Sequence, residues 1–171
     1  AQGFPRAQCN LGVCCEFGTG TKKDVRRAAE NRRRLSTQIA ALLRAGTRGG
    51  LRVVLPMITG PEEWDDVMAE VERCKERLHR RGVEYDRDLE FGCLIEIPAA
   101  ALVADQIMDH GAKFLAIDID DLVRYTVAAG RPESQRGRYE RADVPAVRRL
   151  VDMVCRMAAD RGIPVYMCGI M

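Results

Sequence analysis

Two patterns of apolar and polar residues alternate along the chain. Short apolar runs, which predict buried strands, cover residues 51–55, 91–95, 114–117 and 164–167. Longer stretches with apolar residues at helical spacing predict helices, at residues 22–45, 61–81, 99–110 and 145–161. Strands that alternate with helices in this way are typical of a parallel α/β fold. The pattern alone fits both a closed barrel and an open sheet.

Acidic residues stand directly after two of the predicted strands. Glu96 follows the second strand, and Asp118, Asp120 and Asp121 follow the third. Parallel strands joined by a helix have their carboxyl ends at the same rim of the sheet, so we expect these side chains to face one another. Carboxylates, water and phosphate oxygens are the ligands that Mg²⁺ prefers. The sequence therefore predicts a magnesium site at this rim.

Five blocks in the chain resemble the TIM-barrel domain of the phosphoenolpyruvate-utilising enzyme family. The blocks are GCLIEIPAA at 92–100, FLAIDIDDLVRYTVAAGR at 114–131, LRVVLPM at 51–57, PAVRRLVDMV at 145–154 and YMCG at 166–169. The first is similar to the family pattern G-x-M-x-E-x-P-x-A-A, and the second to F-x-S-I-G-T-N-D-L-T-Q-Y-T-L-A-x-D-R. The likeness is strongest to the C-terminal domain of enzyme I-type phosphoenolpyruvate–protein phosphotransferases, which serve sugar transport.

This resemblance implies a fold and a division of the chain. The fold would be α/β, a partial (β/α)8 TIM barrel of the phosphoenolpyruvate/pyruvate type. Its last strand would be missing, and its first strands have no clear match. Residues 1–21 would form an irregular N-terminal segment, and residues 22–171 the partial barrel that binds phosphoenolpyruvate.

The resemblance also implies roles for single residues. Glu96 and Asp121 would hold Mg²⁺, and Asp120 and Arg131 would bind the substrate. Cys168 would give or take the proton at the methylene carbon of phosphoenolpyruvate and pyruvate. The phosphoryl group would pass to a histidine on a phosphohistidine domain or carrier protein, on a longer or a separate chain, and pyruvate would be released.

Several residues depart from the family pattern. Asp118 and Ile119 stand for a glycine and a threonine, Asp120 for an asparagine, Gly130 for an aspartate and Ile170 for a glutamate. The family's G-[YFW]-R-x-x-R strand has no clear counterpart, and this chain carries no phosphohistidine domain. These changes favour a truncated or degenerate protein with weakened or lost transfer activity.

Composition narrows the partners and the compartment. The 171 residues carry a net charge of +2, and no apolar run approaches the roughly 20 residues of a membrane span, so we expect neither nucleic acid nor membrane as partner. Seven cysteines without a secreted spacing indicate a reducing cytoplasm. The resemblance adds a homodimer to these expectations.

Two alternatives remain open at this point. The chain could be a non-catalytic dimerisation or binding remnant of the family. It could also be a related Mg²⁺-dependent enzyme, such as pyruvate phosphate dikinase, phosphoenolpyruvate synthase or a citrate-lyase-like aldolase.

Overall fold

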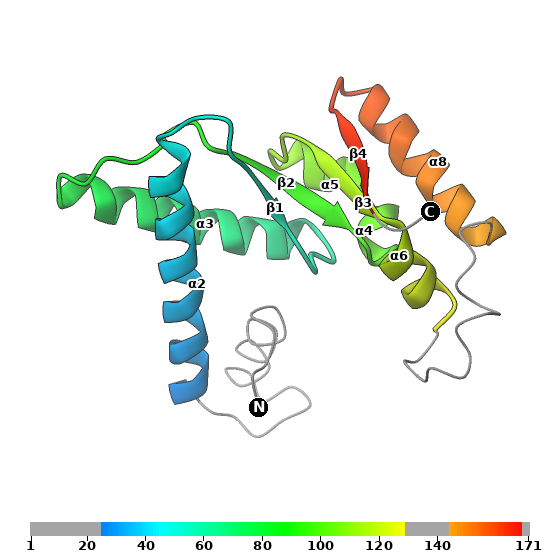
Figure 1. The fold of residues 1–171 in the computed structure, drawn as a ribbon. Helices are drawn as coiled ribbons and strands as arrows, with labels where there is room; N and C mark the ends of the chain where they lie inside the picture. The colour runs from blue at the N-terminus through cyan, green and yellow to red at the C-terminus, as the bar shows by residue number, and fades with distance from the viewer. Residues whose placement is uncertain (1–24, 129–143, 169–171) are drawn as a thin grey trace. The chain divides into compact units, whose positions relative to one another are not determined.

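The computed structural model describes residues 25–128 and 144–168, which combine helices with one parallel sheet (Figure 1). The strands are β1 (Arg52–Leu55), β2 (Glu90–Ile95), β3 (Leu115–Asp118) and β4 (Val165–Cys168). The helices are α2 (Val25–Gly46), α3 (Pro61–Arg80), α4 (Pro98–Leu102), α5 (Ala104–Asp109), α6 (Ile119–Thr126) and α8 (Pro145–Ala159). The predicted parallel α/β fold is confirmed. The predicted irregular segment at residues 1–21 lies outside the described residues.

The chain divides into two compact units. One contains α2 and the part of α3 from Met68 onward. In it the Ser36 hydroxyl donates to the Glu70 carboxylate, and the Cys74 thiol donates to the Ser36 carbonyl oxygen over 3.5 Å. The apolar side chains buried in this unit are Ile39, Leu43, Val71, Cys74, Leu78 and Leu89.

The other unit contains the sheet, whose strands follow one another in chain order, β1-β2-β3-β4, all parallel. Because side chains alternate between the faces of a strand, the register puts one set of paired residues on a single buried face. This set consists of Val53, Leu55, Phe91, Cys93, Ile95, Leu115 and Ile117. Helices α4, α5 and α8 contact one another and bury small and branched side chains: Ala100, Ala101, Ala104, Ile107, Val147, Val154 and Ala158.

Trp64, the one tryptophan of the sequence, is completely buried in the same unit. Its indole Nε1–H donates to the carbonyl oxygen of His110 over 3.1 Å. The His110 ring in turn lies 2.9 Å, Nδ1 to Oδ2, from Asp65. The indole thus joins the start of α3 to the end of α5, and its only polar atom is satisfied.

Two elements differ from the sequence-based expectation. The helix predicted at 99–110 is two helices, because Val103 leaves the helical region with φ −120° and ψ 24°. A β-branched residue such as valine has a restricted χ1 in a helix, which lowers its helical preference. Helix α6 was not predicted, because its polar first turn, with Asp120 and Asp121, resembles a loop. None of the described helices combines the length and apolar character that a membrane span requires.

Candidate metal and substrate site

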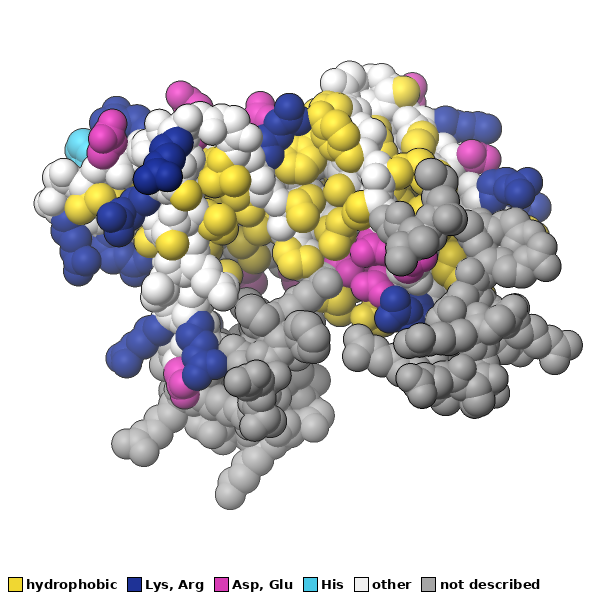
Figure 2. Space-filling view, in the orientation of Figure 1, with side chains coloured by type: hydrophobic (Ala, Val, Ile, Leu, Met, Phe, Trp, Pro, Cys, Tyr) yellow, Lys and Arg dark blue, Asp and Glu magenta, His cyan; other side chains and the backbone are white. Residues whose placement is uncertain are grey.

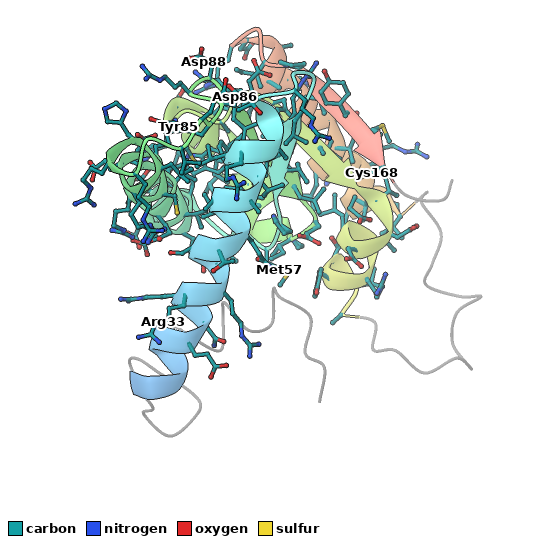
Figure 3. All side chains as sticks on the ribbon, turned by 60° about the vertical axis from the view of Figure 1, so that its left-hand side comes forward. Arg33, Met57, Tyr85, Asp86, Asp88 and Cys168 are labelled. Atoms are coloured by element: carbon teal, nitrogen blue, oxygen red, sulfur yellow. The ribbon has the colours of Figure 1, made fainter. Side chains whose placement is uncertain are left out.

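The carboxyl ends of β2, β3 and β4 bring three polar side chains to one rim of the sheet. Asp118 is the last residue of β3 and pairs with Cys168, the last residue of β4. Glu96 follows directly on the pair formed by Ile95 and Ile117, so it stands beside Asp118. By strand alternation, Glu96, Asp118 and Cys168 share the face opposite the buried apolar set. Figure 3 labels Cys168 at the end of its strand.

Three carboxylates, which we call the rim carboxylates, converge there: Glu96, Asp118 and Asp121. One oxygen from each lies within 4.8 Å of the others. Glu96 is completely buried, and the two aspartates are half-buried. Figure 2 shows acidic side chains gathered near the start of α6. Ionised carboxylates this close repel one another, and a divalent cation with hard oxygen ligands relieves that repulsion, so the donor set fits Mg²⁺.

Helix α6 brings Asp121 back to the rim. The Asp118 side chain caps this helix, because its Oδ1 accepts a hydrogen bond from the Asp121 N–H over 3.2 Å. One turn later, Arg124 lies 2.6 Å from Asp121 Oδ1 and offsets part of the negative charge. Sequence reasoning did not identify Arg124, because helix α6 was not predicted. Asp118, an aspartate directly before a short apolar-periodic stretch, is a recognisable N-cap signal that could have indicated this helix.

Met57 is a second residue that sequence reasoning missed. Its backbone N–H donates to Glu96 Oε1 over 2.7 Å, which holds the buried carboxylate in place. Figure 3 labels Met57. Its φ of 58° lies in the left-handed region, where a residue with a side chain is strained. A strained backbone that orients a site carboxylate is an arrangement found at functional sites.

We expect Met57→Gly to raise the free energy of unfolding by up to about 1 kcal/mol, because glycine adopts φ of 58° without strain. The N–H to Glu96 is retained in this variant. Urea denaturation of the wild type and of Met57→Gly measures the difference. Met57→Ala, which keeps the strain but loses the long side chain, is the control; equal losses in both variants would show that side-chain packing dominates.

Cys168 lies beside the rim carboxylates, and the residue as a whole is exposed to solvent. Its Sγ donates to the Ile117 carbonyl oxygen over 3.3 Å. Burial of the sulfur raises the pKa of the Cys168 thiol, and the negative charges of Asp118 and Asp120 raise it further. Both effects favour the neutral thiol over the thiolate.

Of the two remaining predicted site residues, one lies among the described residues and one does not. Asp120 is exposed in the first turn of α6 and is outside the group of rim carboxylates. Arg131 lies outside the described residues. The roles of Glu96, Asp121, Asp120, Arg131 and Cys168 stay predictions.

Comparison with known proteins gives a family and several relatives. A family described as PEP-utilising enzyme, PEP-binding domain matches residues 21–171. Phosphoenolpyruvate-protein phosphotransferases of Priestia megaterium and Bacillus subtilis are 37% and 35% identical, over 78% and 85% of this chain. A protein of Methanocaldococcus jannaschii named "Probable phosphoenolpyruvate synthase" is 31% identical over 79% of this chain. The matches span 23%, 25% and 11% of these relatives, so the chain corresponds to a fraction of their length.

Proposed function

The chain belongs to the PEP-utilising enzyme family, and we propose that it is the phosphoenolpyruvate-binding C-terminal domain of an enzyme I-type phosphotransferase. In this role it binds phosphoenolpyruvate, whose phosphoryl group passes to a histidine of a phosphohistidine domain or carrier protein, and pyruvate is released. The observation that carries the proposal is the convergence of Glu96 and Asp121 with Asp118 at the rim. A homodimer in the cytoplasm, serving sugar transport, belongs to the same proposal.

The sheet would be part of a (β/α)8 barrel. Two features support this. The strands are all parallel and keep chain order, as in a barrel, whereas doubly wound sheets reverse their order at a switch point. In addition, side chains at the two edges of the sheet meet, since the Arg52 guanidinium of β1 lies 2.6 Å from the Tyr166 hydroxyl of β4.

The rim supplies the groups that such a substrate requires. Glu96 and Asp121 would hold Mg²⁺, and Asp120 and Arg131 would orient the substrate. A bound Mg²⁺ polarises phosphoryl oxygens and offsets their charge. Arg131 can offer a planar pair of N–H donors to two phosphate oxygens at once.

Cys168 would handle the proton. When the phosphoryl group leaves the enol oxygen, the remaining enolate becomes pyruvate by taking a proton at its methylene carbon. The protonated thiol at the end of β4 stands next to Asp118 and would donate it. In the reverse direction the thiolate would remove a proton from the methyl group of pyruvate.

A related phosphoenolpyruvate enzyme is the second candidate, supported by the 31% identical Methanocaldococcus jannaschii relative. A non-catalytic binding module is the third. It is supported by Asp118 and Asp120, which add negative charge beside the site of an anionic substrate. A chain that sediments as a dimer and binds no phosphoenolpyruvate would favour this third candidate over both enzymes.

We expect the wild-type chain to bind phosphoenolpyruvate in the presence of Mg²⁺ and to lose this binding in EDTA. Glu96→Gln should weaken the binding at least about tenfold, because it removes a charged ligand but retains an acceptor for the Met57 N–H. Isothermal titration calorimetry measures both effects.

Glu90→Gln is the matched control, since Glu90 is the exposed first residue of the same strand, β2, and pairs with Arg52. It should bind as the wild type does. Absence of heat at millimolar phosphoenolpyruvate and Mg²⁺, in a chain that is folded by circular dichroism, would contradict the proposed function.

A further inference from the structure

We propose that Asp118 is a third carboxylate ligand of the cation, so that this chain holds the metal before any substrate arrives. The inference rests on the proposed function and concerns a residue outside the expected ligand pair. Where the family pattern has a glycine, this chain has an aspartate whose carboxylate joins those of Glu96 and Asp121 within 4.8 Å.

The backbone directs Asp118 toward the other two carboxylates. Asp118 is the last residue of β3 and lies beside Glu96, on the same face of the sheet. Its Oδ1 also accepts the Asp121 N–H over 3.2 Å, which sets the distance between the two aspartates. A carboxylate has two oxygens and about four acceptor sites. The capping hydrogen bond therefore leaves capacity to coordinate a cation.

The third carboxylate changes what the cation requires. A Mg²⁺ site with one or two carboxylates depends on water and substrate phosphate for its other ligands. A third carboxylate occupies one of these positions and adds negative charge, which strengthens cation binding without substrate. Arg124, paired with Asp121 over 2.6 Å, offsets part of the added charge. Asp120, exposed in the same first turn of α6 as Asp121, is outside the group of rim carboxylates.

Binding of Mn²⁺ to the 171-residue chain, followed by electron paramagnetic resonance without phosphoenolpyruvate, tests the inference. Mn²⁺ takes the same oxygen ligands as Mg²⁺. Asp118→Asn should lower the affinity for Mn²⁺ about tenfold or more. Asparagine is as good an N-cap as aspartate, so α6 should persist, which circular dichroism checks.

Asp120→Asn separates ligation from charge, because it removes the same charge from a residue two positions along the chain. It should lower the Mn²⁺ affinity less than about threefold, as expected for an exposed charge in water. Addition of phosphoenolpyruvate should restore much of the affinity lost in Asp118→Asn, because substrate oxygens then take the vacated position.

The outcomes distinguish this inference from the proposed function. If Asp118→Asn and Asp120→Asn lower the affinity equally, while Glu96→Gln abolishes Mn²⁺ binding, Asp118 is not a ligand and the proposed function stands. If the folded wild-type chain binds no Mn²⁺, both are overturned. A loss in Asp118→Asn at least several times larger than that in Asp120→Asn establishes the third carboxylate.

Discussion

Cys168→Ala is expected to slow the exchange of the methyl protons of pyruvate with solvent deuterium by about 10²–10⁴-fold, the usual contribution of a positioned acid–base group. In the proposed reaction, the thiol at the end of β4 is the group that moves a proton to and from this carbon. Alanine fills less space than cysteine and leaves the backbone of β4 unchanged. Proton NMR of pyruvate in D₂O, with the chain and Mg²⁺, measures the exchange rate.

Cys155→Ala is the control for this prediction, because Cys155 is the other exposed cysteine among the described residues and lies on α8. It should exchange pyruvate protons as fast as the wild type. Phosphoenolpyruvate binding should survive in Cys168→Ala, since the thiol is not assigned to hold the substrate. Exchange at the wild-type rate in Cys168→Ala would exclude the proton role. Loss of both proton exchange and phosphoenolpyruvate binding would instead indicate that the variant no longer folds correctly at the rim.

Gly92→Ala is expected to lower the free energy of unfolding by about 3 kcal/mol, the upper part of the range for overpacking a core. A Cβ at this position would lie 2.5 Å from the Phe114 carbonyl oxygen and 2.6 Å from its ring. The ring can turn, but the carbonyl belongs to the backbone that leads into β3, so the strain must move the sheet. Urea denaturation followed by circular dichroism measures the change.

Gly60→Ala is the matched control, because a Cβ there meets no atom within 4 Å and the backbone is not left-handed. Its free energy of unfolding should remain within about 0.5 kcal/mol of the wild-type value, as for most changes away from packed positions. If both alanine variants are equally stable, the approach of β2 to Phe114 is looser than the structure indicates.

Strand positions could be predicted closely from the sequence. The apolar run predicted at 91–95 is Glu90–Ile95 in the structure, and the run at 114–117 is Leu115–Asp118. Buried parallel strands leave this signal because both neighbouring strands and covering helices exclude polar residues. The same reasoning placed Glu96 and the aspartates at one rim, since parallel strands end together.

Other parts of the site depend on backbone geometry that leaves little trace in the sequence. The left-handed conformation of Met57 follows from its surroundings, because methionine has no preference for it. Helix α6, which brings Asp121 toward Glu96, was not predicted because its first turn is polar.

The buried indole of Trp64 makes this unit spectroscopically distinct. Since the sequence has no other tryptophan, excitation near the red edge of protein absorption reports on this one side chain. Its environment is dry and its N–H is held by the His110 carbonyl, so its emission differs between the folded and the solvated state. Intrinsic fluorescence therefore reports on the unfolding of the sheet-bearing unit. Helix α2 contains no tryptophan, so its melting is followed by circular dichroism instead.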